Sequence, residues 1–399
     1  MSMSAGPANG DAVVYLHQAS QGIFAERTVH LAFIALAWLV HQTVPADPWI
    51  IMSMLHGCAG LGCVWWVARI GTLWRVPRRV SVWAAVLLLL PWAGWAEVDC
   101  FWLWFALIGA GTRREGWASA SLAVACLFSP AGLLFLPWCL WIRRQRYPKQ
   151  TVLRLLLTAG GAVGGAWFVV GCVGGLDWWV GQRGVLLGFG WAPGKTLGSW
   201  LLYGIPWMLL PLFFSNIFRS ARWGVACALF GLLGPADTPL WLPLGFSCVW
   251  CCGPGEGRAF LGHWGAVLLL GLHGIWFGTV WIQGFNRVFY ENQMVADVAH
   301  GLSEGEGFVA PWSLGVRVSM KKTGDPYGWP WRGPKRIYPN GHGVWCGTPL
   351  IRWAILPPEN PRSDTTPGNL KEYGIRWVEA ADGMQKHGCQ SASPEKERQ

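Results

Sequence analysis

Long apolar runs, separated by short polar loops, occupy the chain between residues 28 and 285. A helix that crosses a membrane needs about 20 mostly apolar residues, and many of these runs approach that length. The pattern therefore predicts an all-α polytopic membrane bundle with about ten membrane segments. The predicted segments cover residues 28–46, 49–74, 80–96, 98–111, 116–142, 152–175, 200–218, 223–235, 238–252 and 263–285.

The run over 116–142 contains Ser129-Pro130, which predicts a break into two passes or a re-entrant pair. Such breaks are tolerated at membrane depth where protein covers the freed backbone groups. Counting two passes puts the basic loops on one side, which the positive-inside rule assigns to the cytoplasm. The same count places residues 1–27 on that side. The basic loops contain Arg75, Arg78 and Arg79, then Arg113 and Arg114, then Arg143, Arg144, Arg146 and Lys149, then Arg219 and Arg222, and finally Arg258.

The two ends of the chain differ from the apolar middle. Residues 1–27 are polar and are predicted to form a loop segment before the transmembrane helical domain at 28–285. From residue 286 the sequence predicts one helix and two strands, which indicate a small extracytoplasmic α/β domain over 286–385. A polar tail over 386–399 is predicted to be disordered. The helix is expected at Glu291–Leu302, and the strands at Gly307–Pro311 and Tyr373–Val378.

Composition supports a membrane protein. Hydrophobic residues make up 53% of the chain and charged residues 13%, whereas soluble domains contain about 25% charged residues. The net charge of +10 sits mainly in short loops between apolar runs. That distribution is typical of membrane topology rather than of a nucleic-acid surface, so we expect membrane lipid and no nucleic acid as partner. The expected location is the plasma (inner) membrane.

Carboxylates in three places are candidates for chemistry. Glu97 and Asp99 lie between two apolar runs, and because a carboxylate in hydrocarbon is costly, we expect them just above the outer membrane surface. Asp11 and Asp237 are the other two candidates. Such groups can act as a general base or bind a divalent cation that neutralises a phosphate, or they can simply be solvated loop residues.

Basic residues of the predicted outer loop over 176–199 offer a second kind of chemistry. Arg183 and Lys195 can bind a phosphate by charge and hydrogen bonding, or contact lipid head groups. His30, at the start of the first apolar run, is either an interfacial hydrogen-bonding residue or part of a site.

Several segments in order resemble the GT-C membrane glycosyltransferases. The stretch from Gly10-Asp11-Ala-Val-Val-Tyr15 to Arg27-Thr-Val-His30 is similar to the first outer loop and second helix of that family. Glu97-Val-Asp99, before an apolar run and an Arg-Arg pair, resembles the second acidic loop. Leu240-Trp-Leu-Pro243 after Asp237 resembles a late helix, and Tyr373–Val378 the last strand of the outer domain. Family members begin with a further membrane helix, so the resemblance implies either that the true start lies upstream or that this copy lacks the first helix.

The resemblance implies an inverting enzyme that moves a sugar from a polyprenyl-phosphate donor to a protein, lipid or glycan acceptor at the outer face. It further implies that Asp11 and the second acidic loop share one outer pocket, in contrast to the loop count. A transporter or flippase of a lipid-linked substrate, or an inactive scaffold, is the alternative. The expected site comprises catalytic Asp11, Glu97 and Asp99, substrate-binding Tyr15, His30, Arg183, Lys195 and Asp237, and a divalent cation (Mg or Mn) on Asp11 and Asp99.

Overall fold

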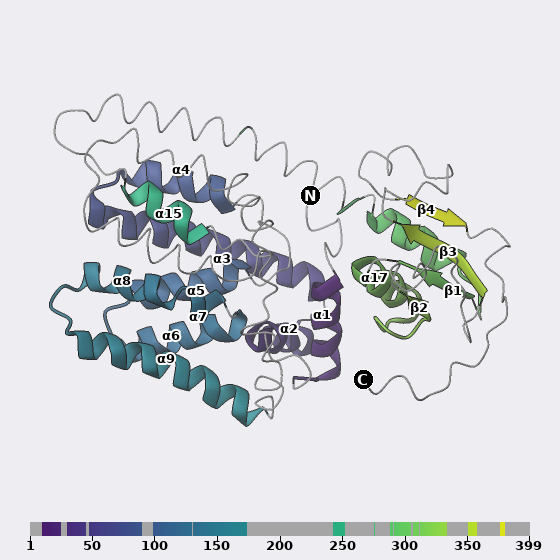
Figure 1. Ribbon diagram of the computed structural model, residues 1–399, viewed down its shortest axis with the longest axis horizontal. Coiled ribbons are helices and arrows are strands. Elements are labelled where there is room, and N and C mark those ends of the chain that lie inside the picture. Colours follow the sequence, from purple (N-terminus) through teal and green to yellow (C-terminus); the bar gives the residue numbers. More distant parts are fainter. Residues whose placement is uncertain are drawn as a thin grey trace, which may run out of the picture. The chain divides into compact units, whose positions relative to one another are not determined.

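A computed structural model describes thirteen parts of the 399-residue chain. By contacts, the chain divides into two compact units: residues 18–282, here the helical unit, and residues 1–17 with 283–399, here the mixed unit. The described part is mostly helical (Figure 1). It comprises residues 10–24, 30–44, 48–89, 99–129, 131–173, 242–251, 275, 288–289, 291–304, 306–310, 312–332, 350–356 and 376–379.

Two described stretches, Trp49–Trp74 and Val152–Cys172, are long and apolar enough to cross a membrane. They correspond to α3 (Pro48–Gly71) with the 3-10 turn η3 (Thr72–Trp74), and to α9 (Val152–Cys172). The other predicted segments that the structure describes are shorter helices, so the count of about ten crossings stays a prediction. These are α2 (Leu31–Thr43), α4 (Arg78–Leu89), α5 (Asp99–Gly111), α6 (Glu115–Phe128) and α15 (Leu242–Cys251). The predicted segments at 200–218 and 223–235, and 263–285 apart from residue 275, lie outside the described residues.

The predicted break near Ser129 is a tight reversal of the chain. Helix α6 ends at Phe128, and α7 (Ala131–Leu134) and α8 (Leu136–Arg146) lead back. The side-chain Nε2 of Gln150 donates to Glu115 Oε1 at 3.5 Å, so the residues at the start of α6 and just after α8 lie close together. The 14 residues of α6 rise only about 21 Å, less than the roughly 30 Å of a hydrocarbon core. The structure thus confirms the break and the reversal, whereas the choice between two passes and a re-entrant pair stays a prediction.

The reversal depends on Gly132. Its amide donates to the Ser129 carbonyl at 2.9 Å. A Cβ at this position would lie 2.7 Å from backbone atoms of Ala125 and Cys126. Backbone cannot move aside as the end of a flexible side chain can, so α7 packs against α6 only because this residue has no side chain.

Gly132→Ala should therefore destabilise the helical unit. Overpacking of this kind costs about 1–3 kcal/mol, and thermal unfolding in detergent would show it as a lower midpoint. Gly160→Ala in α9 is the matched control, because a Cβ there meets nothing within 4 Å. A helical Gly→Ala change without a clash should be neutral or slightly stabilising. Equal midpoints for the two variants would contradict the close approach at Gly132.

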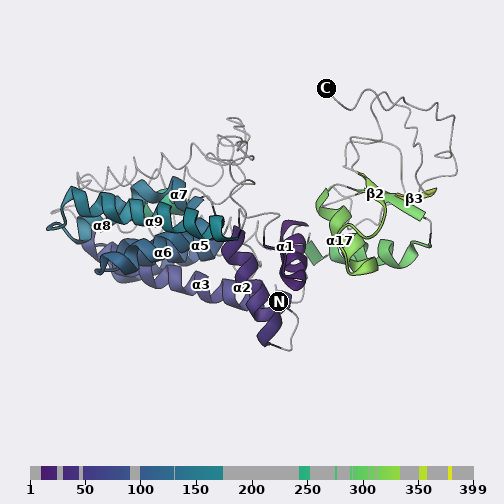
Figure 2. The ribbon, with the colours of Figure 1, turned by 90° about the horizontal axis from the view of Figure 1, so that it is seen from below.

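Stacked indole rings join α3, α8 and α15. The Trp74 ring stacks on Trp141 at 4.9 Å and on Trp250 at 5.2 Å between centroids. Trp138 stacks on Trp250 at 5.7 Å and donates its indole N–H to Ser247 Oγ at 2.8 Å. Large aromatic surfaces of this kind dominate the packing of a core. Helices α3, α5, α6 and α9 lie side by side in that order in both views (Figure 2).

The mixed unit contains a four-stranded sheet in the order β2-β1-β3-β4. Strand β1 pairs in parallel with β2 and β3, and β3 pairs antiparallel with β4. Helix α17 (Trp312–Thr323) connects β1 to β2, and with the helical segment 291–301 it buries Val298, Phe308 and Leu314 in one core. The predicted helix and both predicted strands fall on described elements. The strands are β1 (Glu306–Val309), β2 (Trp331–Arg332), β3 (Leu350–Leu356) and β4 (Arg376–Glu379).

The predicted polar loop at residues 1–27 is wrong in part, because α1 (Gly10–Gln21) is a helix. Its apolar side chains are buried, among them Val13, Val14 and Ala19. A helix of 12 residues is marginal by itself in water, so its formation depends on this tertiary burial. The local sequence is too polar on average to reveal it.

Candidate functional site

Charged residues of the described helical unit lie at the ends of its helices. Arg113 and Arg114 follow α5, and Arg154 lies in the first turn of α9. Contacts bring these ends together: Arg154 Nη1 lies 3.6 Å from Glu115 Oε1 at the start of α6. The Arg146 guanidinium lies 5.8 Å from the Trp66 ring near the end of α3. We call this the basic end, formed where α3, α5 and α8 end and where α4, α6 and α9 begin.

Arg143 holds the basic end together. Its side chain is fully buried. The guanidinium donates to the carbonyls of Gly109 and Arg113 at 3.3 Å each, and to that of Thr112. These are carbonyls at the end of α5, which have no partner within the helix. A cation at this position also interacts favourably with the helix dipole. Arg143 thus caps the C-terminal end of α5.

The charge of Arg143 is maintained despite burial. Burial lowers its pKa, and the nearby Tyr147 and Glu115 raise it again in part. An arginine nevertheless remains protonated in proteins, because its ordinary pKa lies far above neutral pH. The Tyr147 hydroxyl donates to the Gly111 carbonyl at 2.7 Å and completes the cap.

The opposite end of α5 begins at Asp99 and is held by a histidine. The Cys100 amide donates to His56 Nε2 at 3.4 Å, which supplies a partner for a helix N-terminal amide that otherwise has none. His56 lies within α3 and is fully buried. Because its Nε2 accepts a hydrogen bond, the neutral ring carries its proton on Nδ1.

A second histidine reaches the same region. His30, immediately before α2, forms a hydrogen bond from Nδ1 to the Phe128 carbonyl at 2.6 Å. The Phe128 ring stacks on Phe101 at 5.1 Å, and Phe101 lies 5.6 Å from the His56 ring. His30, His56, Phe101 and Phe128 thus form a continuous group, which we call the histidine cluster. It lies beside the first turn of α5.

The backbone of Asp99 can be placed along its neighbour α3. His56 lies eight residues after Pro48, or about 12 Å along α3. Asp99 begins α5 beside His56, and the 13 residues of α5 place it about 18 Å from the basic end. Its expected level, just above the outer membrane surface, stays a prediction.

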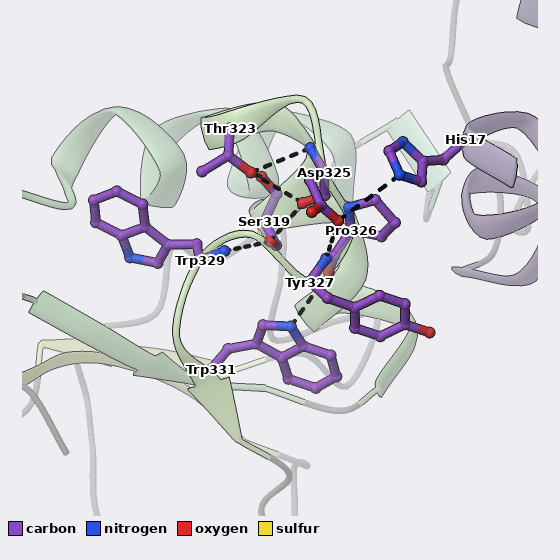
Figure 3. Close-up of polar contacts among 8 residues, drawn as sticks. All are labelled: His17, Ser319, Thr323, Asp325, Pro326, Tyr327, Trp329 and Trp331. Carbon is purple, nitrogen blue, oxygen red and sulfur yellow. Dashed lines mark hydrogen bonds and ion pairs between the residues drawn. The ribbon is translucent and has the colours of Figure 1, made fainter. Parts of the chain in front are cut away.

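The mixed unit has its own polar group, at the loop after α17 (Figure 3). His17 Nε2 of α1 lies 3.9 Å from Asp325 Oδ1. The same carboxylate oxygen accepts the Tyr327 amide at 2.8 Å. Ser319 Oγ donates to the Asp325 carbonyl at 2.7 Å and accepts the Trp329 amide at 3.0 Å. The loop is therefore fixed by side chains of α17, with the Asp325 carboxylate half exposed.

The structure divides the predicted site residues between the two units. Asp11 and Tyr15 lie in α1 within the mixed unit, whereas His30 and Asp99 belong to the helical unit. The predicted shared pocket of Asp11 and Asp99 therefore stays a prediction. The remaining predicted site residues lie outside the described residues: Glu97, Arg183, Lys195 and Asp237.

Sequence reasoning missed His56. Its signal was present, because His56 is an ionisable residue well inside a long apolar run, and such residues are rare and functional in membrane segments. Its partner, the amide of Cys100, lies 44 residues away in the chain. Only the packing of α3 against α5 brings the two together.

The expected divalent cation was tested against the donors in the described residues. Within these ranges, no three His, Cys, Asp or Glu side chains come together in a way that could hold a metal. His56 Nε2 already accepts a backbone amide and is not free to bind a cation. We therefore derive no step through a metal ion.

Comparison with known proteins returned no matching family model, curated protein or solved structure. What the chain does must therefore be argued from its residues and their geometry.

Proposed function

We propose that this protein is a membrane glycosyltransferase that moves a sugar from a polyprenyl-phosphate carrier to an acceptor at the outer membrane face. The observation that carries the proposal is the position of Asp99. It begins an apolar helix that is capped by His56 at one end and by Arg143 at the other. An acidic residue on so firmly held a backbone suits a site that meets a lipid-borne phosphate, with a divalent cation or Arg183 or Lys195 offsetting the two negative charges.

The orientation follows from the charges. Cytoplasmic loops collect Lys and Arg, so the basic end is assigned to the cytoplasmic side of the plasma membrane. Asp99, about 18 Å away along α5, then lies toward the outer leaflet. The mixed unit is assigned to the outside, as the resemblance to the GT-C enzymes implies.

The chemistry suits this location. The isoprenoid tail of the carrier dissolves in the bilayer, while its phosphate stays near the surface. A carboxylate base removes the proton from the acceptor hydroxyl, and the oxygen attacks the anomeric carbon from the opposite face. The bond from that carbon to the phosphate oxygen breaks, and the polyprenyl phosphate leaves with the electron pair. The resemblance assigns the base to Asp11 and carrier binding to Glu97 and Asp99.

The experiment follows transfer of tritiated mannose from polyprenyl-phosphate mannose by the full chain in proteoliposomes, with a cell-envelope extract as acceptor. Loss of a general base lowers a rate by about 10²- to 10⁴-fold. We therefore expect Asp11→Asn to lose transfer to that extent, and Asp99→Asn to lose carrier binding and, with it, transfer.

Asp297→Asn is the matched control, because Asp297 is exposed on the helical segment 291–301. All variants should insert and elute from size-exclusion columns as the wild type does. Full transfer by Asp11→Asn would remove that residue from catalysis. Absence of transfer by the wild type from polyprenyl-linked mannose, glucose and arabinose would overturn the proposal.

In the two helices that are long enough to cross a membrane, the distribution of charge favours the enzyme over a transporter. A transporter is expected to carry charged residues inside its bundle. In α3 and α9 as described, the Asp, Glu, Lys and Arg residues are Arg69 and Arg154, each within three residues of a helix end.

A further inference from the structure

We propose that the basic end carries a binding site for an anionic phospholipid, at the place where α6 and α9 begin. The two helices are direct neighbours there. Ser119 Oγ donates to the Thr158 carbonyl at 3.2 Å. A Cβ on Gly161 would lie 3.1 Å from Ser119 Oγ, so the helices pack closely and present one continuous lateral surface.

Cations on this surface are exposed and in excess. Arg113, Arg114, Lys149 and Arg154 are all exposed at the start of the two helices. Glu115 is the acidic residue of these turns, and it is already occupied by Arg154 and Gln150. Among the described contacts of these turns, no acidic side chain pairs with Arg113, Arg114 or Lys149. Their positive charge suits a phosphate group.

The apolar side chains beside these cations suit contact with the acyl chains of a lipid. Trp117, in the first turn of α6, is 64% exposed, and Leu153, in the first turn of α9, is 65% exposed. Exposed Trp beside Arg and Lys is typical of the level where lipid head groups meet acyl chains. A soluble phosphate compound would use the cations alone, whereas a phospholipid uses both the cations and the apolar surface.

The site is distinct from the proposed catalytic region. Asp99 is separated from Glu115 and the basic end by the length of α5, about 18 Å. The inference therefore stands whether or not the protein transfers a sugar. It assigns the basic end to the leaflet that is rich in anionic lipid.

The experiment measures lipid binding to the full chain in detergent by native mass spectrometry. Phosphatidylglycerol is compared with phosphatidylcholine, which has the same acyl chains and no net charge. Each cation near an anionic surface contributes about 1 kcal/mol, or roughly fivefold in affinity. We expect phosphatidylglycerol to bind at least about tenfold more tightly, and Arg113→Gln with Arg114→Gln to lose about 25-fold.

Two variant pairs make the outcome decisive. Lys149→Gln should weaken phosphatidylglycerol binding, whereas Lys321→Gln, an equally exposed lysine of α17 in the mixed unit, should not. Arg113→Lys with Arg114→Lys should retain binding, which separates loss of charge from loss of fold. Equal binding of the two lipids, or an equal effect of the two lysine variants, would overturn the site. Displacement of the lipid by inorganic phosphate at equal concentration would overturn the lipid assignment.

Discussion

Arg143→Met should lower the free energy of unfolding by about 3 kcal/mol, because the change leaves one buried and two partly buried carbonyls at the end of α5 without this donor. Gly109, Thr112 and Arg113 all lose their partner in this variant. Each unsatisfied buried group costs about 1–3 kcal/mol, and hydrogen bonds to a charged donor lie at the high end of the range. Chemical unfolding in detergent, followed by tryptophan fluorescence, would measure the loss.

Two further variants test the reason for this loss. Arg143→Lys keeps the charge but replaces a planar fork with a single ammonium group, so it should recover only part of the stability. Arg114→Met removes an exposed arginine only a few residues from the same helix end. Exposed substitutions of this type usually stay within about 0.5 kcal/mol. A comparable loss in Arg114→Met would show that general charge, rather than the cap on α5, stabilises this end.

Arg317→Met should destabilise the mixed unit by about 3–5 kcal/mol, because it leaves a carboxylate buried without its cation. Arg317 Nη1 lies 2.8 Å from Glu291 Oε2, and these side chains are only 1% and 8% exposed. The other guanidinium nitrogen, Nη2, donates to Asn292 Oδ1 at 2.5 Å. Hydrogen exchange of peptides from α17 and β1 in the full chain would report the loss as faster exchange.

The double variant Arg317→Met with Glu291→Leu should recover much of that stability. Replacing a whole buried ion pair by apolar residues is often neutral or stabilising, whereas removing one partner is not. Lys321→Met, on the exposed face of the same helix, is the control for a change of charge alone. If the double variant is no more stable than Arg317→Met, the buried carboxylate is not the cause of the loss.

The sequence predicts best where one local pattern is sufficient. The apolar runs that became α3 and α9, the break at Ser129, and strand β1 all follow from hydrophobicity, a breaking dipeptide or alternation. The helix over 10–21 was missed because its apolar residues are few and gain their burial from distant segments. Run length does not give helix length, since an apolar run does not show where its helix stops.

The candidate site was predicted only in part, for a related reason. Asp99 and His30 stand out by their place beside apolar runs. The role of His56 depends on a backbone amide 44 residues away in the chain. The role of Arg143 depends on carbonyls that are 30 to 34 residues away. Hydrogen bonds of this kind join helix ends to side chains of other helices, and no local pattern encodes them.

The sequence by itself determined that this chain has apolar helices long enough for a membrane and that its charges lie between them, because hydrophobicity and charge are properties of single residues. Only the tertiary structure decided that the basic turns meet at one end of the helical unit, that the chain reverses between α6 and α8, and that His56 caps the helix of Asp99. These features depend on which helices pack against each other, and packing follows from the fit of whole surfaces.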